Sequence, residues 1–191
     1  MDAFEQVVSE MLWMDGFWVQ TSVKVNLTPK EKKKVGKPTM PRPELDIVAY
    51  RGRDNSLYVV ECKSFINSRG VTFAGLSGAD TVTAGRYKLF SDANAKLRNV
   101  VFNRLTAQLA ESGACPPIPA SNVRLCLACG HIASKENRSK LRKHFEDRKW
   151  ELWDEDWLRK HLENMAKSKY ENQVSHVVAK LLRDKSRLIE L

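Results

Sequence analysis

Two periods of apolar residues alternate along the chain, and they predict both helices and strands. Near the amino terminus, apolar side chains recur at helical spacing, at Phe4, Val7, Val8, Met11 and Leu12. This spacing predicts an amphipathic helix that ends at Asp15 and Gly16. In residues 17–25 the apolar and polar positions instead alternate one by one, which predicts a strand.

Residues 26–43 form a basic segment between this strand and the next. The segment combines several prolines with one glycine and one acid, Glu31. Such a composition is typical of a mobile basic loop rather than a regular element. Its cations are candidates for contacts with nucleic-acid phosphates: Lys30, Lys32, Lys33, Lys34, Lys37 and Arg42.

The next two apolar runs predict a hairpin. Residues 45–50 and 57–64 are β-rich and are joined by a polar turn. If the strands pair symmetrically about that turn, Asp46 lies opposite Glu61. Side chains alternate along a strand, so Glu61 and Lys63 share one face while Cys62 points to the other.

This arrangement predicts a metal site. Two directly opposed carboxylates repel each other, and a divalent cation with oxygen ligands would relieve the repulsion between Asp46 and Glu61. The backbone carbonyl of Cys62 is a candidate third ligand. Lys63 is expected to hold a water or hydroxide near the metal and to stabilise charge that develops on a phosphate.

The rest of the chain predicts further helices and strands. Residues 67–85 are rich in glycine and are expected to be mostly loop. The elements expected beyond them are a helix at 92–111, a buried strand at 123–129, a basic helix at 134–148, a short strand at 150–153 and helices from 154 to 182. This order predicts an α/β fold in which helices flank a mixed central sheet. We expect a single domain over residues 1–191, with a core at 1–153 and a helical extension at 154–191.

Charge and composition narrow the class of partner. Lys and Arg outnumber Asp and Glu by 32 to 23, which gives a net charge of +9 and favours a polyanion such as nucleic acid. No apolar run approaches the ~20 residues of a membrane helix, and the acidic start of the chain does not resemble a secretory leader. We therefore expect a cytoplasmic protein without membrane contacts.

The hairpin resembles a known family. Asp46 followed by Glu61-Cys62-Lys63 resembles the signature of the PD-(D/E)xK nuclease superfamily, which has the restriction-endonuclease-like fold. The stretch FEQVVSEMLWMDGFWV resembles the superfamily's first helix and strand, so Glu5 matches its acidic residue. Glu10 is the alternative, because both acids flank the apolar stripe. LTAQLAE supplies Gln108, at a place where some members carry a polar residue that reaches the site.

The resemblance covers residues 4–64, and residues 86–130 by the order of elements alone. The sequence departs from the pattern in two ways. Pro43 stands three residues before the aspartate instead of next to it, and the basic segment is longer than the core fold requires.

The resemblance implies a metal-dependent endonuclease that hydrolyses phosphodiester bonds in DNA with Mg²⁺ or Mn²⁺. Asp46 and Glu61 would hold the metal together with the Cys62 carbonyl, Lys63 would position the nucleophile, and Glu5 would be a further acid. Superfamily members commonly act as homodimers. One alternative is a non-catalytic nucleic-acid-binding module that retains the nuclease fold. Another is a protein-interaction domain that uses the apolar stripe of residues 174–182.

The cysteines offer a competing metal site. Cys126, Cys129 and His131 lie close together in the sequence, and Cys115 lies upstream, so four zinc ligands are available. The spacing fits a zinc site poorly. Cys126 falls within an apolar strand pattern, which favours buried free thiols.

Overall fold

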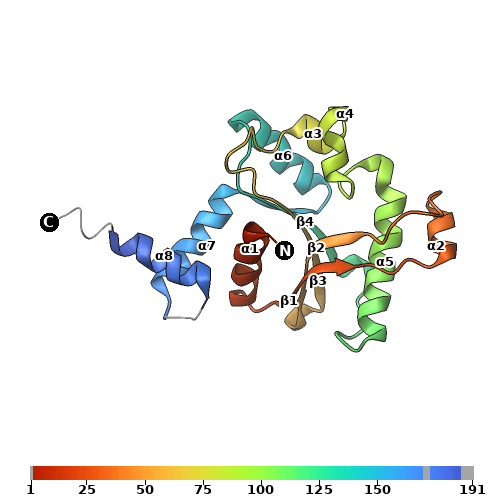
Figure 1. Ribbon diagram of the computed structural model, residues 1–191, viewed down its shortest axis with the longest axis horizontal. Coiled ribbons are helices and arrows are strands. Elements are labelled where there is room, and N and C mark those ends of the chain that lie inside the picture. The colour runs from red at the N-terminus through yellow and green to blue at the C-terminus, as the bar shows by residue number, and fades with distance from the viewer. Residues whose placement is uncertain (1, 170–172, 186–191) are drawn as a thin grey trace.

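The computed structural model describes residues 2–169 and 173–185, and its centre is a five-stranded mixed sheet (Figure 1). The strands follow one another across the sheet in chain order: β1 (Trp18–Lys24), β2 (Glu44–Arg51), β3 (Ser56–Lys63), β4 (Val123–Cys129) and β5 (Glu151–Trp153). The first three strands pair antiparallel, whereas β3, β4 and β5 pair parallel. The predicted α/β class, with a mixed sheet flanked by helices, is confirmed.

Helices cover both faces of this sheet. They are α1 (Ala3–Met14), α2 (Pro29–Lys34), α3 (Phe73–Ser77), α4 (Thr81–Ala84), α5 (Ala95–Glu111), α6 (Lys135–Asp147), α7 (Glu155–Lys167) and α8 (Val174–Lys185). A first core joins one sheet face to α3, α5 and α6, with Val59, Leu105 and Phe145 buried in it. A second core joins the opposite face to α1, α7 and α8, around Val60 and Leu12 (Figure 1). Residues 170–172 and 186–191 of the expected helical extension lie outside the described residues.

The first two strands change faces part-way along their length. In β1, Val19 packs against the second core, but Val25, just beyond the strand, is buried in the first core. In β2, Leu45 is buried in the first core, whereas Ile47, two residues later, is buried in the second core. Ser22 has a φ of 53°, and a left-handed residue within a strand turns the following side chains to the opposite face. The strand predicted for residues 17–25 is confirmed as β1, and its buried side chains change from one core to the other beyond Thr21.

Two segments expected to be irregular contain short helices. The basic segment includes α2, which is stabilised by a capping box. In this box Thr28 N donates to Glu31 Oε2 at 2.7 Å, and Glu31 N donates to Thr28 Oγ1 at 3.2 Å. Pro29 occupies the first turn, where a missing N–H costs little. Residues 67–85 contain α3 and α4, so the prediction that this stretch is mostly loop is wrong in part.

No helix in the described part of the chain combines the length and the apolarity that crossing a membrane requires.

We predict that Gly130→Ala destabilises the protein. A Cβ at Gly130 would lie 2.2 Å from the backbone oxygen of Ser64, so β4 and the chain leaving β3 would have to separate. The hydrogen bond from Gly130 N to Lys63 O, now 3.0 Å, would be strained by this shift. The expected loss is about 1–3 kcal/mol in the free energy of unfolding, measured by urea denaturation.

Gly85→Ala is the matched control for this substitution. A Cβ at Gly85 meets no atom within 4 Å, so the free energy of unfolding should stay the same or rise slightly. Equal stabilities for the two variants would contradict the close approach at Gly130.

Candidate active site

The β2–β3 hairpin has the predicted register. Ile47 pairs with Val60, which is the last ladder pair toward the open end of the hairpin. The next residues outward are Asp46 and Glu61, as expected from a symmetric turn. Asp46 Oδ2 accepts a hydrogen bond from Cys62 N at 2.8 Å, which fixes the aspartate against β3.

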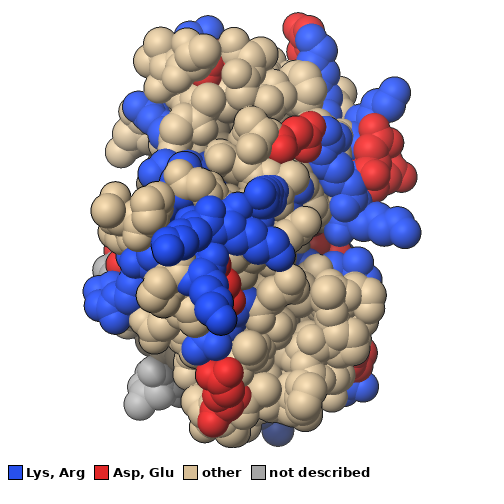
Figure 2. All heavy atoms as spheres, turned by 90° about the vertical axis from the view of Figure 1, so that its right-hand side faces the viewer, with Lys and Arg blue, Asp and Glu red and all other residues tan. Residues whose placement is uncertain are grey.

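Asp46, Glu61 and Lys63 line one groove with a volume of about 550 Å³. Basic side chains from two other segments line the same groove. Lys37 and Arg42 come from the chain that leads into β2, and Arg86 and Lys88 come from the chain that precedes α5. On the side of the molecule that carries α2 and α5, Lys and Arg side chains gather into a band (Figure 2). The groove therefore combines carboxylates with cations that suit phosphate groups.

Glu61 and Lys63 form a short ion pair inside this groove. Lys63 Nζ donates to Glu61 Oε1 at 2.6 Å, and each side chain is only 20% exposed. Burial raises the pKa of Glu61, and the neighbouring charges of Asp46 and Glu5 raise it further, while Lys63 acts in the opposite direction. Burial alone would lower the pKa of Lys63, but the carboxylate of Glu61 outweighs it, so the pKa of Lys63 is raised.

Cys62 points away from the groove. Its side chain is buried in the second core, and burial raises the pKa of the thiol. At neutral pH this thiol stays protonated, so only the backbone of Cys62 is available to the site.

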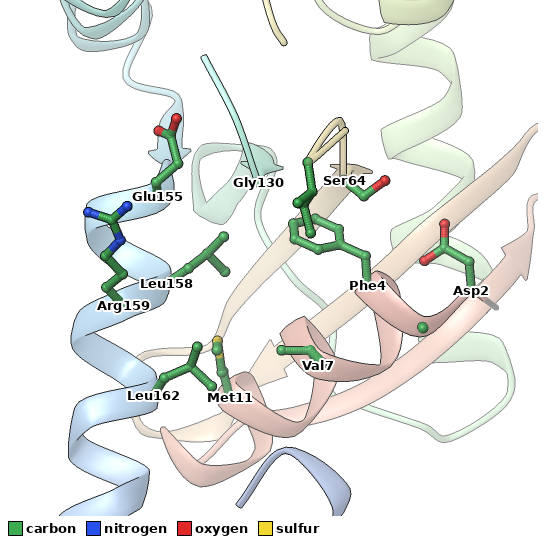
Figure 3. A pocket seen from close by; sticks show the side chains of 12 residues that line it. Asp2, Phe4, Val7, Met11, Ser64, Gly130, Glu155, Leu158, Arg159 and Leu162 are labelled. Carbon is green, nitrogen blue, oxygen red and sulfur yellow. The ribbon is translucent and has the colours of Figure 1, made fainter. Parts of the chain in front are cut away.

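Glu5 lies near the carboxylates, on the first turn of α1. Its Oε2 accepts a hydrogen bond from Asp2 N at 3.2 Å in the capping box of that helix. Burial raises the pKa of Glu5, and Asp46 contributes to the same shift. Asp2 and Phe4 lie beside Ser64, the residue after Lys63, so the start of α1 meets the end of β3 (Figure 3).

Glu5 and Glu10, the two candidate acids of α1, have different surroundings. Glu10 Oε2 accepts a hydrogen bond from Ser175 N at 2.9 Å and another from the Ser175 hydroxyl. Glu10 therefore anchors α8 to α1. Glu5 is the acid that interacts electrostatically with the candidate site.

Gln108 has a structural role. Its Nε2 donates to Lys24 O at 3.1 Å, and its Oε1 accepts from Asn26 N at 3.0 Å. These bonds fix α5 to the end of β1, and Gln108 is not among the residues that line the groove.

The predicted phosphate-binding cations divide into two groups. Lys37 and Arg42 line the groove, whereas Lys30, Lys32, Lys33 and Lys34 belong to α2. Sequence reasoning missed Arg86 and Lys88. The pattern that could have found them is the basic residue on each side of Tyr87, an aromatic side chain that is buried in the first core.

The cysteines do not converge. Cys126 is buried in the second core and Cys129 in the first, so their side chains lie on opposite faces of the sheet. All four cysteines are free thiols. Across residues 2–169 and 173–185, no three His, Cys, Asp or Glu side chains cluster so that they could hold a metal ion. Asp46 and Glu61 provide only two side-chain ligands, so a metal bound there would also need a backbone oxygen as a ligand.

A second hollow, of about 650 Å³, lies between α1 and α7. Val7 and Met11 of α1 face Leu158 and Leu162 of α7 across it (Figure 3). Its lining is mainly apolar and includes neither Asp46 nor Glu61 nor Lys63. This hollow is therefore separate from the charged groove.

Comparisons with known proteins found no matching family model, no similar curated protein and no similar solved structure.

We predict that the Glu61 carboxyl titrates above the ordinary range of glutamate and responds to its neighbours in opposite directions. Lys63→Met should raise the pKa of Glu61 further, because the ammonium stabilises the carboxylate. Asp46→Asn should lower that pKa, because a repelling negative charge is removed. Carboxyl ¹³C chemical shifts followed against pH measure both changes.

Glu136 is the internal reference for this titration. It also forms a 2.6 Å pair with a lysine, Lys140, but at 75% exposure, and that hydrogen bond lowers its pKa. A Glu61 midpoint at or below that of Glu136 would contradict the buried, repulsive environment.

Proposed function

We propose that the protein is a metal-dependent nuclease of the PD-(D/E)xK type, with the restriction-endonuclease-like fold, that hydrolyses phosphodiester bonds within DNA. The observation that carries the proposal is the presence of Asp46, Glu61 and Lys63 in one groove with four basic side chains. The order of the sheet and the position of α1 beside the end of β3 support the fold assignment.

The carboxylate pair fits a hard divalent cation, Mg²⁺ or Mn²⁺. One oxygen of each carboxylate is engaged by the protein, through Cys62 N for Asp46 and through Lys63 for Glu61. Asp46 Oδ1 and Glu61 Oε2 receive no hydrogen bond from the part of the chain that the structure describes. These two oxygens and the carbonyl of Cys62 are the ligands we propose. A bound cation would make a coordinated water more acidic and offset charge on the phosphate.

Lys63 acts as a donor in this proposal. Its raised pKa keeps the amine protonated at neutral pH, so it is unsuited to remove a proton. A protonated amine beside the carboxylates orients the attacking water or hydroxide and stabilises negative charge that develops on the phosphate. Glu5 keeps a further acidic charge near Asp46.

The groove favours the phosphate backbone as the feature recognised. Its described lining contains no aromatic side chain on which a base could stack. Lys37, Arg42, Arg86 and Lys88 provide positive charge instead. Binding is therefore expected to depend steeply on salt concentration.

The same groove would serve a non-catalytic nucleic-acid-binding module, which is the second candidate function. The basic lining supports both functions equally, and only the carboxylate–lysine arrangement favours hydrolysis.

We predict that the protein nicks or cuts DNA in the presence of Mg²⁺ or Mn²⁺. Asp46→Asn, Glu61→Gln and Lys63→Ala should each lower the cleavage rate by about 10²-fold or more, as expected when a group that stabilises the transition state is lost. Conversion of supercoiled plasmid to nicked and linear forms measures internal cleavage, and end-labelled linear DNA detects exonuclease action.

Glu136→Gln and Lys140→Ala are the matched controls, because they break an equally short pair on the exposed face of α6. Both should cut at the wild-type rate. If the wild type binds DNA but leaves every substrate intact with either metal, the nuclease proposal is wrong and the function is that of a non-catalytic nucleic-acid-binding module.

A further inference from the structure

Arg86 lines the groove and has an aromatic neighbour, Phe65. Its guanidinium carbon lies 6.0 Å from the centroid of the Phe65 ring, at the outer edge of the range for a cation–π contact. Phe65 follows β3 closely and packs partly against the first core. Its backbone is left-handed, with φ of 43°, so the ring is not directed by the alternation of the preceding strand.

The backbone that carries Arg86 is also anchored. Arg86 lies in the short 3₁₀ turn Gly85–Tyr87, and Tyr87 is 3% exposed within the first core. The side chain of Arg86 is exposed, although Tyr87 is buried and Phe65 is partly buried. Its position is therefore set by the fold while its guanidinium remains accessible from the groove.

The guanidinium of Arg86, in contrast to that of Arg138, is not committed to a structural ion pair within the part of the chain that the structure describes. Arg138 forms ion pairs with Asp154, Glu155 and Asp156, and these pairs link α6 to α7. Among the described residues, Arg86 forms no ion pair with a carboxylate. A planar donor without a carboxylate, fixed beside the groove, suits a phosphate oxygen.

We propose that Arg86 binds a phosphate of the nucleic-acid substrate in the groove, and that Phe65 is a positioning residue that holds its guanidinium there. This inference rests on the proposed function and adds a contact from a segment remote from the hairpin. The groove then receives cations from two segments, residues 37–42 and residues 86–88.

The test measures binding without cleavage. Asp46→Asn protein is titrated with a DNA duplex in the absence of divalent metal, over a series of salt concentrations. Adding Arg86→Ala should lower the slope of log K against log salt by about 0.9, the value for one lost phosphate contact. Arg86→Lys should restore the slope, because the charge is kept.

Arg53→Ala is the matched control, because Arg53 is an exposed arginine in the hairpin turn and does not line the groove. Adding Arg53→Ala to the Asp46→Asn protein should leave the slope of log K against log salt unchanged. If the Arg86→Ala variant has the same slope of log K against log salt as the Asp46→Asn protein, the inference is overturned.

The role of Phe65 is tested by a double-mutant cycle. Phe65→Leu should weaken binding, Phe65→Tyr should preserve it, and Phe65→Leu should have no further effect once Arg86 is alanine. Additive losses in the double variant would overturn the positioning role. Thermal unfolding confirms that each variant is folded, and the Arg86 substitutions leave both cores intact.

The outcomes for this inference and for the nuclease proposal are distinct. If the wild type cuts DNA and the Arg86→Ala slope is unchanged, only the inference about Arg86 fails. If the wild type binds without cutting and the slope falls, the Arg86 contact stands and the nuclease proposal fails. If the Asp46→Asn protein does not bind DNA at low salt, the Arg86 contact fails, and cleavage by the wild type alone decides the nuclease proposal.

Discussion

The candidate site depends on one hydrogen bond, from Cys62 N to the carboxylate of Asp46 at 2.8 Å. The bond lies where the ladder between β2 and β3 ends and where β2 changes from one face of the sheet to the other. A polar side chain that replaces a ladder partner satisfies a backbone donor that would otherwise be costly to bury. The hydrogen bond to Oδ2 also fixes the orientation of the Asp46 carboxylate and leaves its second oxygen, Oδ1, available to a ligand.

Burial gives the site its electrostatic character. Glu61 and Lys63 lie in the part of the sheet that α5 and the chain before it partly cover, so solvent screens their charges less than those of surface pairs. Burial raises the pKa of Glu5 and of Glu61, and repulsion from Asp46 adds to both shifts. The buried carboxylate of Asp154, by contrast, is neutralised by ion pairs with Arg138 and Arg142.

Local patterns predicted much of this architecture. The strand at residues 123–129 and the hairpin register emerged from apolar period and turn composition, because both depend on neighbours in the sequence. The composition of residues 26–43, rich in proline and lysine, does not indicate helix α2, although the capping box that stabilises this helix is local.

Features that depend on distant contacts could not be predicted. The break at Ser22 follows from packing against two separate cores, and the bonds of Gln108 join residues more than eighty positions apart in the chain. Arg86 enters the groove because Tyr87 is buried, which the sequence of a glycine-rich stretch does not disclose. The hydrogen bonds of Glu10 to Ser175 likewise depend on the position of α8, which is remote in the sequence.

The break at Ser22 also protects the open edge of the sheet. β1 is an edge strand, and an added strand would need a straight row of backbone donors and acceptors along it. The left-handed residue divides that row into two short pieces, and the opposite edge strand, β5, is only three residues long. Growth of the sheet by addition of another molecule is therefore disfavoured at both edges.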